Sequence, residues 1–106
     1  ITNYTSEGKI RVDALVGVGY DEDIKATKKV LMDVLTKHPK VLKQPEPSVN
    51  VLELADSSVN FAVRPYCKPE DYWEVYFATY ERAKLALDQA NIEIPYPHTV
   101  EIHKQG

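Results

Sequence analysis

The chain has few of the features that mark disulfide-stabilised, nucleic-acid-binding or membrane-spanning proteins. It has one cysteine, Cys67, so an internal disulfide is excluded and a reducing compartment is favoured. Its 13 Lys and Arg residues are outnumbered by 16 Asp and Glu residues, and the net charge of −3 argues against a basic nucleic-acid-binding face. Its apolar runs are far shorter than the roughly 20 residues that a membrane helix needs. The sequence therefore predicts no membrane-spanning helix.

What remains is the composition of a small globular domain, with 43% apolar and 27% charged residues among 106. A chain of this length is sufficient for one domain with a modest core. It begins at Ile1 without a Met, on a strand-like stretch that has no partner before it. We expect that the sequence was cut from within a longer protein.

The first half of the chain predicts a strand, a helix and a hairpin. Residues 11–20 alternate with the period of a strand, and Gly17 and Gly19 share one face, where we expect a helix to pack closely. The acids of residues 21–23 suit a helix N-terminus, and Pro39 ends that helix near His38. Val12, Ala14, Val16 and Val18 share one face of the strand, and the apolar residues that recur at helical spacing are Ile24, Thr27, Val30, Leu31, Val34 and Leu35.

Residues 40–47 are typical of a loop, and the next two runs, residues 48–54 and 59–64, alternate as the strands of a hairpin. The alternation slips where Val51 and Leu52 stand side by side, which predicts a β-bulge.

A second helix is predicted to open at Pro69 and to end at Asn91, a plausible C-terminal cap. Val75 lies outside the apolar stripe of this helix. We therefore expect the first turns of the helix to carry more apolar surface than one sheet buries. The predicted stripe is Trp73, Tyr76, Phe77, Tyr80, Ala83, Leu87 and Ala90.

The order strand, helix, strand, strand, helix, strand predicts an α+β fold, a ferredoxin-like βαββα sandwich with a projecting C-terminal strand. The projection is expected because Pro95 and Pro97 bracket Tyr96 just before the last strand. Proline lacks the N–H that a sheet ladder needs, so this strand can be held away from the sheet.

Catalytic and metal-binding patterns are missing. The loop after the first strand carries three acids, residues 21–23, where a phosphate site needs backbone amides and a cation. The three histidines lack ligand spacing, and Cys67 has no histidine near it in sequence. Asn60 and Arg64 share a strand face, and facing solvent or a partner is favoured over binding an anion. We expect no enzyme, no cofactor and no metal site.

Three tracts resemble the C-terminal cytoplasmic domain of the small-conductance mechanosensitive (MscS) channel family. They are VGVGYDEDI at residues 16–24, SSVNFAVR at residues 57–64 and IPYP at residues 94–97, in the same order as in the family. The resemblance covers essentially the whole chain. Residues 1–5 look like the closing strand of the small β-domain that precedes this region in the family. The family's pore helix is missing, so no gating residue can be carried over.

The resemblance implies part of a homo-heptameric channel that opens under membrane tension and releases ions and small solutes on hypoosmotic shock. In that family the C-terminal portion forms a hollow cage on the cytoplasmic side of the cell membrane, and the last strands of the subunits form a parallel barrel at its base. The implied division is residues 1–9 as the end of a preceding β-domain, residues 10–94 as the ferredoxin-like domain and residues 95–106 as spacer and barrel strand.

Two sets of residues follow from this expectation. Candidate subunit-assembly residues are Trp73, Val75, Phe77, Pro95, Tyr96, Pro97, Val100 and Ile102. Candidate barrel-lumen residues are Thr99, Glu101 and His103, which alternate with Val100 and Ile102; which set points inward stays open. The alternative interpretation is a free-standing ferredoxin-like regulatory or ligand-binding module, in which the last strand returns to the sheet.

Overall fold

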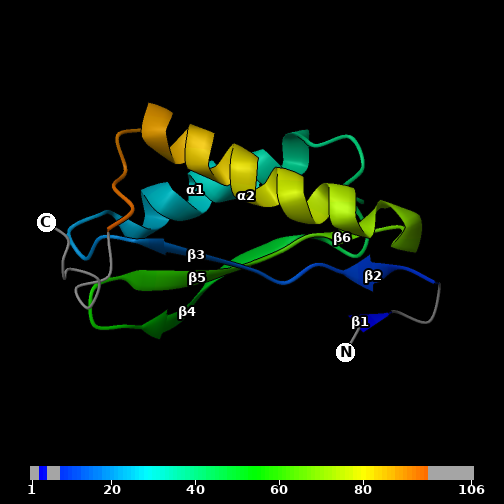
Figure 1. The fold of residues 1–106 in the computed structure, drawn as a ribbon, viewed down its shortest axis with the longest axis horizontal. Helices are drawn as coiled ribbons and strands as arrows, with labels where there is room; N and C mark the ends of the chain where they lie inside the picture. The colour runs from blue at the N-terminus through cyan, green and yellow to red at the C-terminus, as the bar shows by residue number, and fades with distance from the viewer. Residues whose placement is uncertain (1–2, 5–7, 96–106) are drawn as a thin grey trace, which may run out of the picture.

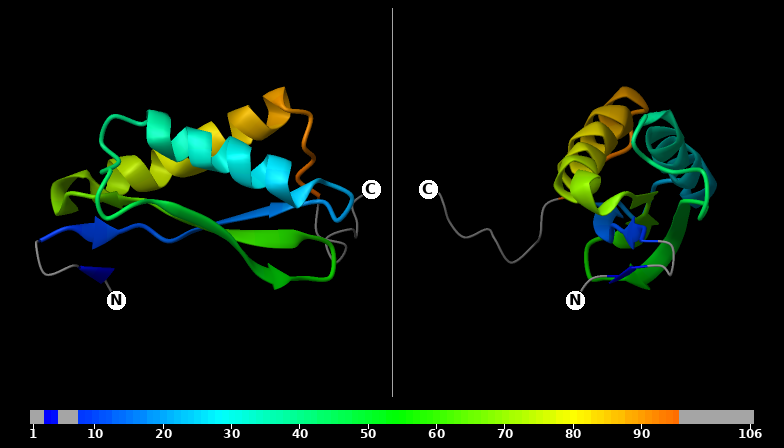
Figure 2. Two further views of the ribbon diagram at one scale, coloured as in Figure 1. Left: turned by 180° about the vertical axis from the view of Figure 1, so that it is seen from behind. Right: turned by 90° about the vertical axis from the view of Figure 1, so that its right-hand side faces the viewer.

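The structure is a computed structural model that describes residues 3–4 and 8–95. Two α-helices lie side by side over one face of a three-stranded antiparallel sheet, as the end-on view in Figure 2 shows. The sheet order is β3-β5-β4. The elements follow the chain as β3 (Ala14–Val18), α1 (Ile24–Lys37), β4 (Ser48–Leu54), β5 (Val59–Arg64) and α2 (Tyr72–Gln89) (Figure 1). This confirms the predicted ferredoxin-like α+β class, while the projecting last strand lies outside the described residues.

The predicted hairpin is confirmed at both strands. β4 and β5 pair antiparallel from Ser48 opposite Arg64 to Leu54 opposite Val59. The register shifts between Val51 and Glu53, which is the predicted bulge. β5 also pairs with β3, so it is the central strand.

A second, smaller sheet extends the molecule at one end. Its strands are β1 (Asn3–Tyr4), β2 (Ile10–Arg11) and β6 (Tyr66–Cys67), in the order β1-β2-β6. The strand predicted over residues 11–20 is therefore divided between two sheets. The Val12 amide donates to the Pro65 carbonyl at 2.8 Å, next to the place where the chain passes from one sheet to the other. The division expected between residues 9 and 10 falls within this small sheet and stays a prediction.

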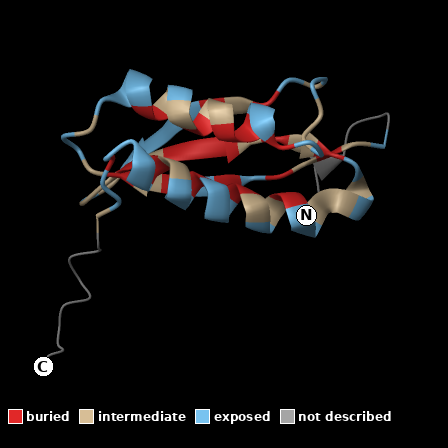
Figure 3. Cartoon of the chain, turned by 90° about the horizontal axis from the view of Figure 1, so that it is seen from above, coloured by how far each residue is buried: buried red, intermediate tan, exposed pale blue. Residues whose placement is uncertain are grey.

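The core lies between the helices and the larger sheet (Figure 3). Phe61, Leu31, Leu35 and Leu87 are its largest fully buried side chains. A second cluster under the start of α2 consists of Ile10, Val12, Cys67 and Val75.

The predicted N-terminus of α1 and C-terminus of α2 are confirmed, whereas α2 begins at Tyr72, after a single 3-10 turn over Pro69–Asp71. Asp23 is the N-cap of α1, where its carboxylate accepts a hydrogen bond from the Ala26 amide at 2.9 Å. Asn91 follows α2 with φ of 60°, and the next amide, that of Ile92, donates to the Leu87 carbonyl. This left-handed residue ends the helix and turns the chain back toward the sheet.

Two predictions about packing were wrong. The buried residues of α2 are Val75, Thr79, Ala83 and Leu87. Of the predicted stripe, Trp73, Phe77, Tyr80 and Ala90 are exposed, and Tyr76 is half-buried. The close neighbours of Gly17 belong to the sheet and not to a helix. A Cβ at Gly17 would lie 2.8 Å from the Asn60 side-chain oxygen and 3.2 Å from the Ser58 hydroxyl.

Candidate functional site

The most distinctive surface of the molecule is a row of aromatic side chains along α2. We define the aromatic surface as Trp73, Tyr76, Phe77 and Tyr80. Trp73 is 61% and Phe77 is 62% exposed, which is unusual for the two largest kinds of apolar side chain. The ring centroids of Trp73 and Phe77 are 5.7 Å apart, and those of Tyr76 and Tyr80 are 5.2 Å apart. The rings thus form one continuous cluster, in which Trp73, Phe77 and Tyr80 are exposed and Tyr76 is half-buried.

The helix period explains why these rings face outward. Val75, Thr79, Ala83 and Leu87 recur every four residues and point into the core. The aromatic residues lie on the neighbouring stripe of the same helix. The Thr79 hydroxyl donates to the Val75 carbonyl at 2.7 Å, so this polar side chain is buried with its hydrogen bond satisfied.

Val75 does not belong to the exposed surface, and its expected role in subunit assembly needs correction. It is 0% exposed and packs with Ile10, Val12 and Cys67. Of the expected assembly residues on α2, only Trp73 and Phe77 are available to a partner.

Tyr80 connects the aromatic surface to the free edge of the larger sheet. The Leu15 amide in β3 donates to the Tyr80 hydroxyl at 3.0 Å. The neighbouring phenol of Tyr80, followed by burial, raises the pKa of Tyr76. From its spacing Tyr80 is predicted only as part of the apolar stripe of the second helix. Its exposure and this bond depend on which stripe of α2 faces inward, and no local pattern shows that.

The end of the described chain lies beside the same edge. The segment after α2 descends to the end of β3 (Figure 1). The Gly19 amide donates to the Glu93 carbonyl at 3.0 Å, and the Glu93 amide donates to the Glu22 carboxylate at 3.0 Å. Pro95 is half-buried. The other candidate residues of the terminus lie outside the described residues: Tyr96, Pro97, Thr99, Val100, Glu101, Ile102 and His103.

An ion-pair cluster fixes the loop after α1 to the start of α2. The Lys40 ammonium lies 2.8 Å from the Glu74 carboxylate and 3.6 Å from that of Asp71. The hydrogen bond to Lys40 lowers the pKa of Glu74, and the same bond raises the pKa of Lys40. These groups are exposed, so the cluster orients the loop more than it stabilises the fold.

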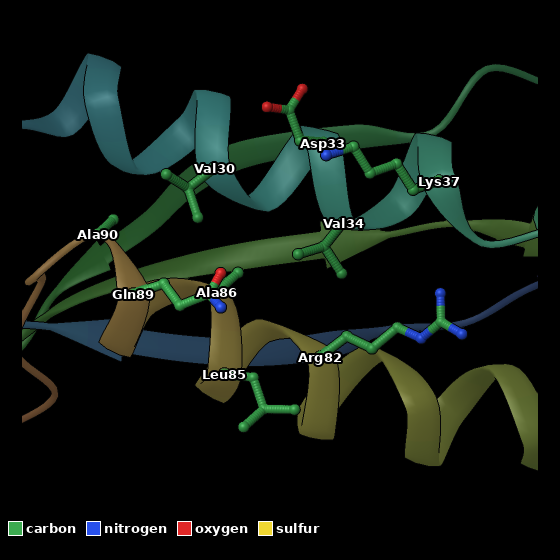
Figure 4. Close-up of a pocket in the computed structure, with 9 residues that line it drawn as sticks. All are labelled: Val30, Asp33, Val34, Lys37, Arg82, Leu85, Ala86, Gln89 and Ala90. Carbon is green, nitrogen blue, oxygen red and sulfur yellow. The ribbon is translucent and has the colours of Figure 1, made fainter.

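The groove between the two helices does not have the composition of an active site. It encloses about 430 Å³, and Figure 4 shows side chains from α1 and α2 lining it. Its ionisable groups are Asp33, Lys37 and Arg82, among valine, alanine and leucine side chains. These residues include no nucleophile, and within residues 8–95 no cluster of His, Cys, Asp or Glu is arranged to hold a metal ion.

Cys67 and His38 are both held in states that disfavour reaction. Burial, aided by Asp71 and Glu70, raises the pKa of the Cys67 thiol to about 11, so it is protonated at neutral pH. His38 is buried, and its Nδ1 accepts a hydrogen bond from the Lys40 amide at 3.0 Å. Burial, followed by the charge of Arg82, lowers the pKa of His38, so it is a neutral part of the loop.

The fold defines this chain as a ferredoxin-like α+β domain, and comparison with known proteins gives its family. The family description "Mechanosensitive ion channel MscS, C-terminal" matches residues 12–94. A small-conductance mechanosensitive channel of Edwardsiella ictaluri is 42% identical over 97% of this chain and 36% of its own length. An uncharacterised MscS family protein of Synechocystis is 41% identical over 92% of this chain and 33% of its own length. The chain belongs to the MscS mechanosensitive channel family.

Solved structures agree with this assignment. The closed-state crystal structure of Helicobacter pylori MscS aligns with a TM-score of 0.80 and 32% identity, covering 93% of this chain and 39% of that one. The structure of AtMSL1 aligns with a TM-score of 0.69 at 10% identity, which shows the shared fold alone. The family consists of mechanosensitive channels and not of enzymes.

The chain spans about a third of the length of the curated relatives that it matches. In the part of the chain that the structure describes, no helix is both long and apolar enough to cross a membrane.

Proposed function

We propose that this chain is the cage domain on the cytoplasmic side of a homo-heptameric mechanosensitive channel. The channel releases ions and small solutes when hypoosmotic shock stretches the membrane. The chain contributes walls and subunit contacts, and the membrane-spanning helices belong to the rest of the protein. Family membership over residues 12–94 and the match to a closed MscS channel support the channel role.

The observation that carries the structural part of the proposal is the exposure of Trp73 and Phe77. The core of the domain is complete without them, because α2 is anchored by Val75, Ala83 and Leu87. Each large aromatic side chain buries about 150–250 Å² when covered, and apolar burial contributes about 25 cal/mol per Å². Two adjacent rings therefore offer a partner several kcal/mol, and such patches mark interaction sites.

We assign this contact to neighbouring copies of the same chain. A ring of identical subunits needs contacts that close on themselves, and apolar aromatic patches suit permanent assemblies. In this proposal Trp73 and Phe77 lie at the contact between neighbouring domains. Pro95, Tyr96 and Pro97 direct the chain to the base of the cage. Val100 and Ile102 are the candidate assembly residues of the barrel there, and Thr99, Glu101 and His103 are the candidate lumen residues. Residues 1–9 end the β-domain that precedes the cage wall.

A free-standing regulatory module is the alternative, and it differs in the fate of the last strand. Such a module would pair residues after Pro95 with the open edge of β3. In a monomeric module Trp73 and Phe77 would also stay exposed to solvent, and an exposed apolar patch of this kind favours aggregation.

A chimera tests the channel role directly. This chain would replace the matching third of the Edwardsiella ictaluri channel, to which it is 42% identical. We expect currents that open under membrane tension in patches, because the grafted segment has the same fold and the same family contacts. A Trp73→Ala, Phe77→Ala version is the matched variant, and it should yield fewer assembled channels. A chimera that reaches the membrane as an assembled oligomer but gives no current under tension would contradict the channel role.

A further inference from the structure

A second pocket lies between the last turns of α1 and the loop that joins α1 to β4, residues 38–47. Its volume is about 460 Å³, which is within the range of sites that bind small molecules. The side chains that line it are mainly apolar, as is usual for such sites. The apolar lining residues are Met32, Pro39, Val41, Leu42 and Pro47.

Contacts with the rest of the domain hold this loop in place. In Figure 1 the loop leaves the end of α1 and returns beside β6, where the Leu42 amide donates to the Tyr66 carbonyl at 2.8 Å. The Lys9 ammonium donates to the Gln44 carbonyl at 3.2 Å, and the ion pairs of Lys40 fix the first turn of the loop to the start of α2. Because the wall is held at several points, little affinity is lost in ordering it around a ligand.

The polar groups of the pocket favour an anion. His38 is buried, and its Nδ1 accepts a hydrogen bond from the Lys40 amide, so the proton of the neutral ring is on Nε2. In the part of the chain that the structure describes, this Nε2–H has no hydrogen-bond partner, and His38 lines the pocket. The lining also holds two ammonium groups, those of Lys37 and Lys43, against one carboxylate, that of Glu46. A negatively charged ligand is therefore favoured over a positively charged one.

We propose that this pocket binds small aliphatic carboxylates. The hydrocarbon chain lies against the apolar wall, and the carboxylate accepts hydrogen bonds from the His38 Nε2–H and the Lys43 ammonium. An acid of about eight carbon atoms suits a pocket of this volume. The inference goes beyond the proposed function and is independent of it, because the whole pocket lies within one chain.

Met32 provides a direct test, because it is the one methionine of the chain and its side chain lines the pocket. We would label its methyl group with ¹³C and titrate the 106-residue chain with sodium octanoate, and separately with octylammonium chloride, below the concentrations at which they form micelles. Octanoate should shift the methyl signal in NMR spectra saturably. Octylammonium has the same chain with the opposite charge and should bind at least about fivefold more weakly.

A lysine variant and its control test the anion contact. Lys43→Gln should weaken octanoate binding at least about fivefold, and the fold should tolerate it because Lys43 is exposed. Lys25→Gln removes the same charge from an exposed position of α1 outside the pocket lining and should leave the affinity unchanged.

Three results would overturn the inference: a Met32 signal that octanoate does not shift, equal affinity for the two amphiphiles, or equal weakening by Lys43→Gln and Lys25→Gln. None of them bears on the proposed function, which the currents of the chimera test separately.

Discussion

Cys67 shows how a single buried residue makes stability depend on pH. Its side chain is fully buried beside Val75 and Val12, and burial raises the pKa of its thiol to about 11. In an unfolded chain a thiol titrates near 8.5. The folded state therefore disfavours the thiolate, and the stabilising difference is complete below about pH 8.5 and is lost as the pH rises toward 11.

We expect the free energy of unfolding to fall by about 2 kcal/mol more in the wild-type chain than in Cys67→Ala between pH 8 and pH 10.5. Tyrosine and lysine ionise in both proteins, so the comparison isolates the thiol. Urea unfolding followed by circular dichroism at the two pH values measures the difference. Equal pH dependence in the two proteins would show that the thiol is not held protonated by the fold.

At the scale of single elements, α1 begins where a side chain satisfies its first amides. The Asp23 carboxylate accepts from the Ala26 amide, and the Thr27 hydroxyl donates to the Asp23 carbonyl at 2.8 Å. The cap therefore fixes both the start of the helix and the buried side chain of Thr27.

Asp23→Ala should lower the free energy of unfolding by about 1 kcal/mol, because the Ala26 amide loses its acceptor. Asp21→Ala removes the same charge two residues earlier without touching the cap, and its effect should be small. Urea titration of both variants against wild type decides the point. A matching loss in Asp21→Ala would assign the effect to charge near the helix terminus and not to the cap.

The elements that the sequence predicts well are those that local interactions determine. α1, the hairpin and its bulge depend on neighbouring residues, through Asp23, the alternation of β5 and the slip beside Val51. The small sheet was missed because β2 and β6 are two residues long and pair across more than fifty positions. Its position depends on tertiary packing that leaves no local pattern.

The inward face of α2 was missed for a different reason. Apolar character alone favours Trp73 and Phe77 for the core, whereas the fold buries Thr79 and Ala83. Thr79 is buried at little cost because its hydroxyl is satisfied within the helix. Small inward residues such as Ala83 let the helix pack closely on the sheet. The predicted excess of apolar surface at the start of α2 is thus present at Trp73 and Phe77, whereas Val75 is buried.

On the scale of the whole molecule, the described residues form a core between the helices and the larger sheet, and beside it lie the edge of β3 and the aromatic surface. The open edge of β3 is capped by Tyr80 and Glu93, and the aromatic surface extends along α2 from Trp73 to that same edge. α2 and β3 lie on one flank of the molecule, whereas α1 and β4 lie on the other (Figure 2). We interpret the flank of α2 and β3 as the side on which the next subunit of the cage packs.

The most direct test of this account is the mass of the 106-residue chain in solution, measured by light scattering over a hundredfold range of concentration. We expect the wild-type mass to rise well above the 12.1 kDa of one chain and the Trp73→Ala, Phe77→Ala variant to remain close to it. Leu85→Ala is the matched control, since Leu85 is 57% exposed on the other side of the same helix and should leave the mass unchanged. Circular dichroism melts should show that all three proteins are folded. A wild-type chain that stays monomeric, or equal loss of assembly in the Leu85→Ala control, would contradict the assignment of the aromatic surface to subunit contact.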